Sequence, residues 1–230
     1  DTDKFYLSLL GWSLAMMHVI DAVLGSLASL FRFHRYSPVE KLYSVVLFIA
    51  GLSLRDLSER LSLTGASRES VRIWVHRFSS IFRPSRRVRR LVAVDETVLK
   101  VSGQTCYLWA AIDVDTNEVL AVYASRGRGI PSAIKFLRRV LDSCEGKPVI
   151  VVDRGPWYRW ALDRLGITYF QETFGKRNRI ERWFREIKDR TKMFYNNVNS
   201  KTLKSLEELA TAIAAMHNII KTGGGEVIPT

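Results

Sequence analysis

The order of strand and helix patterns after Leu91 constrains this 230-residue chain more than any other feature of its sequence. Three strand patterns come first, and Asp115-Thr116-Asn117 is a turn signal between the second and the third. A helix, a fully apolar strand of the buried parallel kind, a second helix, a further strand and a long helix follow. The strands are expected over residues 91–101, 106–114, 119–125, 149–152 and 168–174, and the helices over 130–144, 157–165 and 178–194. This order predicts an α/β fold with a mixed sheet that helices cover.

The same order is that of a ribonuclease-H-like domain, in which the fourth strand lies beside the first. Asp95 lies in the first strand, and Asp153 stands at the carboxyl end of the fourth, where open α/β sheets place their sites. Glu181 begins the long helix, and Arg185 and Lys188 share its side of that helix. Carboxylates suit hard cations, and two such ions about 3.5–4 Å apart can clamp attacking and leaving oxygens. We therefore predict that Asp95, Asp153 and Glu181 are catalytic and hold two Mg²⁺ ions, with Mn²⁺ as an alternative metal.

Each of these acids also has a purely structural interpretation. Asp95 could end an apolar strand pattern, Asp153 could cap the next turn, and Glu181 could pair with Arg185 four residues later. Singly, these structural roles are the commoner ones. The catalytic interpretation depends on all three acids occurring at these places in one topology. Glu96 is expected on the opposite face of the sheet from Asp95, because side chains alternate along a strand.

The net charge points to a polyanionic partner. The chain has 35 Lys and Arg against 23 Asp and Glu, a formal charge of +12. Residues 41–90 hold eleven basic and three acidic side chains, and residues 176–230 hold eleven and six. Residues 91–175 are neutral, with ten of each. Two basic regions around a neutral one favour nucleic acid as the partner; helix faces that are merely solvated, or an acidic membrane surface, are the alternatives.

The cysteines and histidines exclude two further classes of protein. Cys106 and Cys144 lie far apart and in no CxxC pair, and the four histidines have no metal-ligand spacing. This argues against a disulfide scaffold or a structural zinc site and suits a reducing compartment. For a protein that binds DNA, we expect a cytoplasmic location in association with the nucleoid.

Residues 37–82 have the outline of a helix-turn-helix, with helix patterns separated by Gly51 and by a turn that contains Gly65. The second helix is expected over residues 54–61 after a Ser53 cap, and the third begins after a Ser67 cap. Long donor side chains near the start of a recognition helix reach base edges and phosphates. An amphipathic helix with a solvated basic face is the alternative. The predicted DNA-contacting residues of the third helix are Arg68, Arg72 and His76.

A basic linker over residues 83–90 follows this module, and Pro84 blocks continuation of the helix. A flexible linker of this composition would follow a DNA backbone or lie in a minor groove, and a solvated hinge is the alternative. The linker residues predicted to contact DNA are Arg83, Arg86, Arg87, Arg89 and Arg90.

Residues 7–33 are almost continuously apolar and long enough to span a bilayer. His18 and Asp21 stand near the centre of this segment, and a carboxylate at that depth in a membrane is costly. We therefore prefer a core or dimerisation helix and keep membrane insertion as the minority interpretation. The predicted organisation is an N-terminal helix, a helix-turn-helix module, a basic linker, a catalytic domain and a tail, over residues 1–36, 37–82, 83–90, 91–222 and 223–230.

Five motifs resemble those of the IS6-type insertion-sequence transposases and extend from about Ser37 to Lys221. They are VAVDETVLKVSG, YLWAAIDVDTNEVL, VVDRGPWY, RNRIERWFREIKDRTK and AAMHNIIK. The resemblance implies a DDE enzyme with a helix-turn-helix before a ribonuclease-H-like catalytic domain. By that resemblance, the catalytic triad is Asp95, Asp153 and Glu181, and the basic positions that contact transposon-end DNA include Lys188, two helical turns after Glu181. The interval between the second and third acids is several residues shorter than is usual in the family.

A DNA transposase is the leading functional hypothesis from this resemblance. It implies a homodimer or larger homo-oligomer that binds inverted-repeat element ends and target DNA, with Mg²⁺ at the three acids. Water would cleave the strand at the element's end, and the freed 3′-OH would attack the target. The short interval between Asp153 and Glu181 prompts one alternative, a decayed or repurposed transposase that acts as a sequence-specific DNA-binding regulator. A structure-selective nuclease of the same fold is another.

Overall fold

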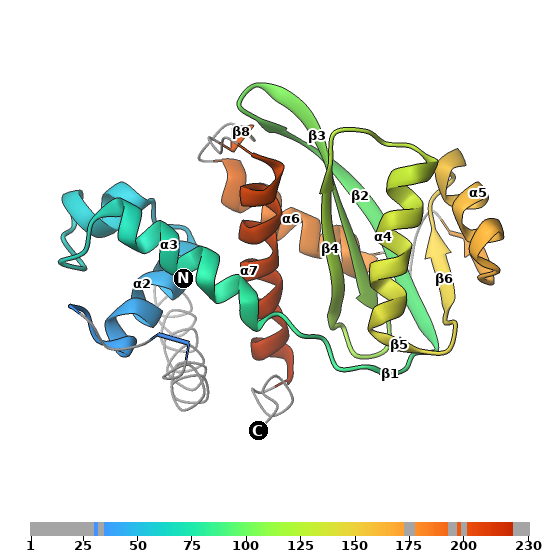
Figure 1. Cartoon of the computed structure of the whole chain (residues 1–230), viewed down its shortest axis with the longest axis horizontal. Helices are drawn as coiled ribbons and strands as arrows, with labels where there is room; N and C mark the ends of the chain where they lie inside the picture. Colours follow the sequence, from blue (N-terminus) through green and yellow to red (C-terminus); the bar gives the residue numbers. More distant parts are fainter. Residues whose placement is uncertain (1–29, 32–34, 173–177, 193–196, 199–201, 223–230) are drawn as a thin grey trace, which may run out of the picture.

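The computed structural model describes residues 30–31, 35–172, 178–192, 197–198 and 202–222 (Figure 1). The apolar helix expected within residues 1–36 and the tail 223–230 therefore lie outside the described residues, apart from 30–31 and 35–36. Within the described ranges, no helix combines the length and the apolar character needed to cross a membrane.

A mixed sheet forms the centre of the molecule, with strands in the order β4-β3-β2-β6-β7. The first three along the chain are antiparallel, whereas β6 runs parallel to β2, and β7 parallel to β6. These strands are β2 (Leu91–Val101), β3 (Gln104–Asp113), β4 (Val119–Ser125), β6 (Val149–Val152) and β7 (Tyr169–Gln171), and the short β8 (Asn197–Val198) pairs with the far end of β2. The predicted α/β class and ribonuclease-H-like strand order are thus confirmed.

Helices cover both faces of this sheet because its buried strands are apolar on both sides. The even-numbered Val92 and Val94 belong to the core under α4 (Ile130–Asp142) and α5 (Pro156–Leu165). The odd-numbered Leu91 and Ala93 belong to the core under α6 (Asn178–Lys192) and α7 (Leu203–Thr222). Strand alternation therefore sends Asp95 toward α6 and α7, and Glu96 toward α4 and α5, as predicted.

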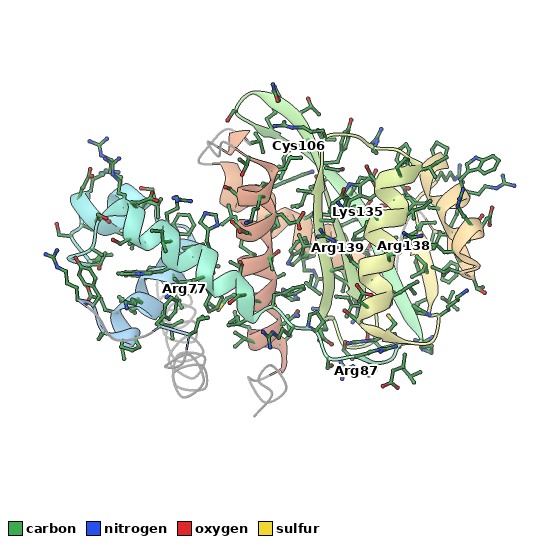
Figure 2. The ribbon with its side chains drawn as sticks, in the orientation of Figure 1. Arg77, Arg87, Cys106, Lys135, Arg138 and Arg139 are labelled. Carbon is green, nitrogen blue, oxygen red and sulfur yellow. The ribbon has the colours of Figure 1, made fainter. Side chains whose placement is uncertain are left out.

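The two helical layers are tied together at the edge of the sheet by Arg139 of α4 (Figure 2). Its guanidinium lies 4.7 Å from the ring centre of Tyr123 on β4 and donates to Glu207 of α7 over 2.6 Å. The other carboxylate oxygen of Glu207 accepts from the backbone N–H of Ala124 at 2.8 Å. This contact fixes α7 across β4, so the helix has one defined position on the sheet.

The N-terminal module consists of α2 (Pro38–Ala50), a short helical turn η1 (Asp56–Arg60) and α3 (Arg68–Phe78), followed by the 3₁₀ turn η2 (Ser79–Ile81). Ser37 and Ser67 cap α2 and α3 by accepting from the backbone N–H three residues later. The second helix, predicted over residues 54–61, is a short π-type turn over Asp56–Arg60. It is wider than an α-helix because the N–H of Leu61 bonds to the carbonyl of Asp56 at 2.9 Å.

This module packs against α7, which separates it from the sheet (Figure 1). The contact involves α3 and η2, and Val75 and Phe78 belong to the same core cluster as Ile213 and Met216 of α7. The short strand β1 (Arg87–Val88) of the linker pairs in parallel with β5 (Cys144–Glu145) of the sheet domain. The linker is therefore part of the folded surface and not the free hinge that its composition suggested.

Candidate active site

Asp95 lies in the middle of β2, the strand between β3 and β6. Asp95 is 9 % exposed, and its Oδ1 accepts a hydrogen bond from the backbone N–H of Glu96 at 2.9 Å. An ionised carboxylate at such a position is costly to bury without a counter-charge. The Asp95 carboxylate therefore needs charged or hydrogen-bonding neighbours, and two cationic side chains of α6, Arg185 and Lys188, line the cavity beside it.

Glu181 occupies the first turn of α6 and is exposed. The apolar stripe of this helix, which includes Trp183 and Ile187, is buried against the sheet, so the opposite side faces outward. A cavity of about 250 Å³ lies between this helix and β2, lined by Asp95, Glu96, Thr97, Glu181, Phe184, Arg185 and Lys188. The structure thus brings Asp95 and Glu181 to one cavity, together with two cationic side chains of α6.

Asp153 follows β6 directly. The parallel register of Ala93 with Val151 puts Asp153 level with Asp95 on the neighbouring strand. One of its oxygens, Oδ1, accepts from the backbone N–H of Gly155 at 2.8 Å. Asp153 does not line the cavity that Asp95 and Glu181 share. Among the described residues, no three His, Cys, Asp or Glu side chains lie close enough to hold a single ion.

The donor chemistry of these acids nevertheless fits a hard divalent cation. Asp95 and Glu181 offer carboxylate oxygens to one cavity, and the carboxyl group of Asp153 ends the adjoining strand. Oxygen donors of this kind suit Mg²⁺ or Mn²⁺ rather than a soft metal.

Gly155 permits a close approach that no other residue would. A Cβ there would lie 2.7 Å from the indole of Trp157 and 2.9 Å from Oδ1 of Asp153. We predict that Gly155→Ala displaces the Asp153 carboxylate or the indole. The substitution should lower the strand cleavage expected from the sequence by about tenfold to a hundredfold, with a stability loss of about 1–3 kcal/mol. Steady-state cleavage and urea denaturation measure the two effects. Gly127→Ala is the matched control, because a Cβ there has no neighbour within 4 Å; equal behaviour of the two variants would contradict the prediction.

A second buried carboxylate, Glu96, lies on the other face of β2 and was assigned no function from the sequence. The hydroxyl of Tyr158, which is fully buried in α5, donates to its Oε2 at 2.5 Å. Arg128 approaches Oε1 at 3.6 Å, and its guanidinium lies 4.2 Å from the ring centre of Trp157. A polar residue on the core-facing side of a strand was the signal that could have revealed this cluster.

The pKa of Glu96 reflects its neighbours. This pKa is raised from 4.5 to about 7: burial is the largest cause, the carboxylates of Asp153 and Asp95 add to it, and Tyr158 and Arg128 oppose it. Glu96 is thus close enough to Asp95 and Asp153 for both negative charges to act on its pKa.

Glu96 makes stability depend on pH. Because the folded pKa lies above the unfolded one, the folded protein binds the extra proton between about pH 4.5 and 7, and stability falls as the pH rises through that range. We predict that Glu96→Gln removes the dependence of stability on pH that Glu96 causes. The free energy of unfolding of the variant, relative to wild type, should therefore rise by up to about 3 kcal/mol between pH 4.5 and 8. Urea denaturation in EDTA across this range provides the measurement, and parallel pH profiles for the two proteins would refute the assignment.

The predicted DNA-contacting residues of α3 differ in accessibility. Arg68 is exposed and pairs with Glu59 at 2.8 Å, and Arg72 is exposed and pairs with Glu69 through two bonds of 2.9 and 2.5 Å. The Nδ1 of His76 instead lies 2.6 Å from a carboxylate oxygen of Glu208 on α7. Burial lowers the pKa of His76 more than Glu208 raises it. His76 therefore belongs to the contact between α3 and α7 and not to an open recognition face.

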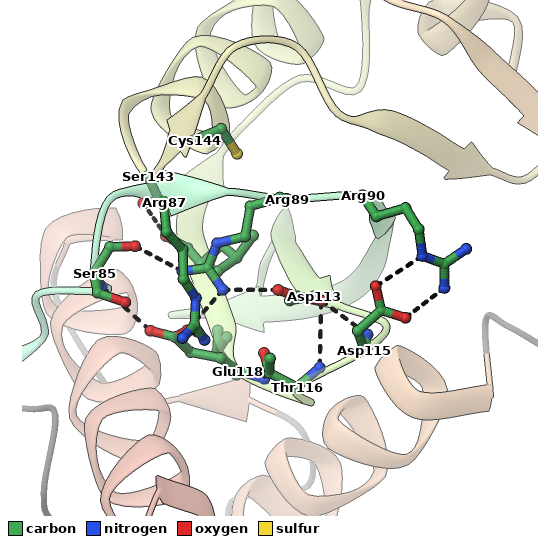
Figure 3. Close-up of polar contacts among 12 residues, drawn as sticks. Ser85, Arg87, Arg89, Arg90, Asp113, Asp115, Thr116, Glu118, Ser143 and Cys144 are labelled. Carbon is green, nitrogen blue, oxygen red and sulfur yellow. Dashed lines mark hydrogen bonds and ion pairs between the residues drawn. The ribbon is translucent and has the colours of Figure 1, made fainter.

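The linker arginines form an ion-pair network with the turn between β3 and β4 (Figure 3). Arg89 has no exposed side-chain surface, and its Nη1 lies 2.8 Å from both Asp113 and Glu118. Arg87 donates to Glu118 at 2.8 Å, and Arg90 pairs with Asp115. We therefore assign Arg89 to the fold and not to DNA contact, because a buried and neutralised guanidinium cannot reach a phosphate. Arg83 and Arg86 remain exposed.

The same turn is held from the other side by the C-terminal motif. Asn218 of α7 accepts from the backbone N–H of Val119 at 2.8 Å and donates to its carbonyl at 2.9 Å. The neighbouring His217 contacts the carbonyl of Asn117 at 3.0 Å through Nε2. These two residues of the AAMHNIIK motif thus anchor α7 to the sheet. The motif therefore has a structural role, although it lies far from the carboxylates in the sequence.

A ribonuclease-H-like sheet with one carboxylate within its central strand and another directly after the neighbouring parallel strand defines a class of enzymes that act on nucleic-acid phosphodiesters. A family model described as a DDE domain, that of IS240-type transposases, matches residues 90–223. The chain is 43% identical over 169 residues to an uncharacterized protein, MJ0017, of Methanocaldococcus jannaschii, covering 73% of this chain and 79% of that one. It is 30% identical over 173 residues to the transposase for the insertion sequence-like element IS431mec of Staphylococcus aureus, covering 68% and 75%.

The chain belongs to the IS6-type family of DDE transposases, and the resemblance predicted from the motifs is confirmed. It is therefore a DDE enzyme, a class that uses a divalent metal. Among solved structures, it is similar to the catalytic core domain of BIV integrase, with a TM-score of 0.41, 17% identity and coverage of 53% of this chain and 80% of that one. The HTLV-2 integrase catalytic core in complex with magnesium gives a TM-score of 0.41, 17% identity and coverage of 53% and 83%.

Proposed function

We propose that this protein binds the ends of an insertion sequence and catalyses Mg²⁺-dependent strand cleavage and strand transfer. The observation that carries the proposal is the shared cavity of Asp95 and Glu181, flanked by Arg185 and Lys188. Asp153 on the adjoining strand end completes the proposed set of catalytic and metal-holding acids. The proposal includes a homodimer or larger homo-oligomer that acts on nucleoid DNA in the cytoplasm.

The chemistry follows from the charges around the cavity. When bound by the acids, Mg²⁺ supplies charge neutralisation at the scissile phosphate and aligns the attacking and leaving oxygens; the proposal includes two such ions. Arg185 and Lys188 lie on the side of α6 that faces the cavity, where they can hold the phosphates beside the scissile one. In the first step the oxygen of water bonds to phosphorus and the 3′-oxygen leaves as a 3′-OH. In the second step that 3′-OH attacks a target phosphate and displaces its 3′-oxygen.

The proposed end-binding surface consists of α3 and the start of the linker. Arg68 and Arg72 are paired with surface carboxylates, and exposed pairs of this kind contribute only about 0–1 kcal/mol. Phosphate oxygens can therefore replace Glu59 and Glu69 at little cost when DNA binds. Arg83 and Arg86 extend this surface along the linker.

The experiment uses the full chain, a duplex that carries the DNA bordering its own coding sequence, and a supercoiled plasmid as target. We expect strand nicking at the element end and joining to the plasmid with Mg²⁺ or Mn²⁺, and neither product in EDTA. End-specific binding without cleavage in either metal would contradict the proposal and indicate a regulator. Cleavage of branched or hybrid substrates without joining would indicate a nuclease. Retention of all three acids is the reason that we do not favour the regulator.

A further inference from the structure

The outer face of α5 has a composition that the active site does not explain. Trp160 is 66 % exposed there, although large aromatic side chains are usually at least half-buried. Arg159 and Arg164 are exposed on the same helix, and Arg154 is exposed in the turn before it. An indole among three guanidinium groups combines the two side-chain types that bind nucleic acid without reading its sequence.

These arginines differ from those predicted to contact DNA. Within the described part of the chain, Arg154, Arg159 and Arg164 have neither an ion pair nor a hydrogen bond. The sole acid of α5, Asp163, is exposed and leaves the face with a surplus of two positive charges. By contrast, five of the arginines predicted to contact DNA already pair with carboxylates: Arg68, Arg72, Arg87, Arg89 and Arg90. The outer face of α5 is therefore a second region of net positive charge, separate from Arg185 and Lys188 in the cavity of Asp95 and Glu181.

The helix that carries this face is firmly fixed. Tyr158, Ala161 and Leu162 on its inner side are fully buried in the core under α4 and α5. At its C-terminal end, the ammonium of Lys147 donates to the carbonyls of Leu165 and Gly166 at 2.7 and 3.2 Å. The outer side chains thus project from a rigid support that begins three residues after Asp153.

The position of α5 indicates which DNA it contacts. In Figure 1, α5 lies at one end of the molecule and α2 and α3 lie at the other, with the sheet and α7 between them. Strand transfer must bring two DNA molecules to the same carboxylates. If α3 holds the element end on one side, the second duplex approaches from the side of α5.

We propose that the outer face of α5, with Arg154, Arg159, Trp160 and Arg164, is the docking surface for target DNA. This inference rests on the proposed function. Target DNA varies in sequence, and contacts to phosphates and to base faces do not depend on sequence. A ten-residue helix is about 15 Å long, enough to follow four or five base pairs. Trp160 stacks on, or wedges into, a base step of the target.

The test separates end cleavage from transfer to target in the full chain. We expect Trp160→Ala and the double variant Arg159→Gln/Arg164→Gln to nick end DNA at the wild-type rate but to join it to plasmid about tenfold more slowly. In anisotropy titrations with a random-sequence duplex, the double variant should lose about two units of salt slope. Trp160→Phe should retain most of the transfer. Lys204→Gln/Lys221→Gln removes two exposed charges from α7 and serves as the matched control.

Each outcome bears on the inference separately from the proposed function. A wild type that neither nicks nor joins would contradict the proposed function, while the random-duplex titration would still test α5. Wild-type transfer and binding by the α5 variants would overturn the inference alone. Equal loss of nicking and joining would assign α5 to the element end and overturn the target assignment. A changed oligomeric state of Trp160→Ala in size-exclusion chromatography would make the face a protein interface and would also overturn it.

Discussion

Glu181→Gln is expected to lower the rate of strand cleavage at least about a thousandfold while leaving end binding within about twofold of wild type. The amide keeps the size of the side chain but removes the anionic oxygen that faces the cavity shared with Asp95. A loss of this size corresponds to about 4 kcal/mol of transition-state stabilisation. Single-turnover nicking of an end duplex in Mg²⁺ measures the rate, and anisotropy measures the binding.

Glu145→Gln is the matched control for this substitution. Glu145 is an exposed acid in the short strand β5, so the same chemical change there should leave both readouts unaltered. Nicking by Glu181→Gln at the rate of Glu145→Gln would remove Glu181 from the catalytic set. The assignment of α6 as the helix that delivers a metal-holding acid would then also fall.

Arg89→Ala is expected to lower the free energy of unfolding by about 3–5 kcal/mol. Its guanidinium has no exposed side-chain surface and donates to Asp113, Glu118 and the carbonyl of Ser85 at 2.8, 2.8 and 2.6 Å. Asp113 and Glu118 are 5 % and 6 % exposed, so the substitution leaves two buried carboxylates without their common cation (Figure 3). Urea denaturation at pH 7 measures the loss.

Arg90→Ala provides the comparison, because Arg90 also makes two bonds to a carboxylate but is 73 % exposed. Its loss should change stability by less than about 1 kcal/mol. Burial raises the pKa of Asp113, but Arg89 and two backbone N–H groups outweigh it and hold that pKa below its usual value. The stabilisation from Asp113 is therefore present above about pH 4 and is lost at lower pH, where the difference between Arg89→Ala and wild type should shrink. Equal losses for the two variants at pH 7 would refute the structural role of Arg89.

Local patterns in the sequence were sufficient to predict most of the fold. The apolar run Val149–Val152 has the length and composition of a buried strand and is one, and residues 119–125 form the predicted third strand. Proline and glycine mark the two ends of α5, since Pro156 suits the first helical turn and Gly166 adopts the left-handed conformation with φ of 61°. Such signals depend on neighbours within a few residues, which is why they can be read without the tertiary structure.

Contacts between residues that are distant in the sequence could not be predicted from those local patterns. Arg89 and Arg90 are adjacent residues of the same type. Arg89 is nevertheless buried in an ion-pair network, whereas Arg90 forms an exposed ion pair with Asp115. His76 continues the basic spacing of Arg68 and Arg72, but the packing of α3 on α7 turns it toward Glu208. The partner in each case comes from a segment far away along the chain, so no local spacing could have revealed it.

The sequence by itself determined the strand order and the family, and it supplied the prediction that Asp95, Asp153 and Glu181 form the catalytic triad, because periodicity, turn residues and motifs are properties of the linear chain. Only the tertiary structure decided how those acids are arranged: Asp95 and Glu181 line one cavity, and Asp153 accepts a hydrogen bond from the N–H of Gly155. It also decided which positive charges are neutralised, since Arg89 is buried with two acids while the arginines of α5 project outward. Charge can be counted along a sequence, but its compensation depends on which side chains the fold brings within a few ångströms of each other.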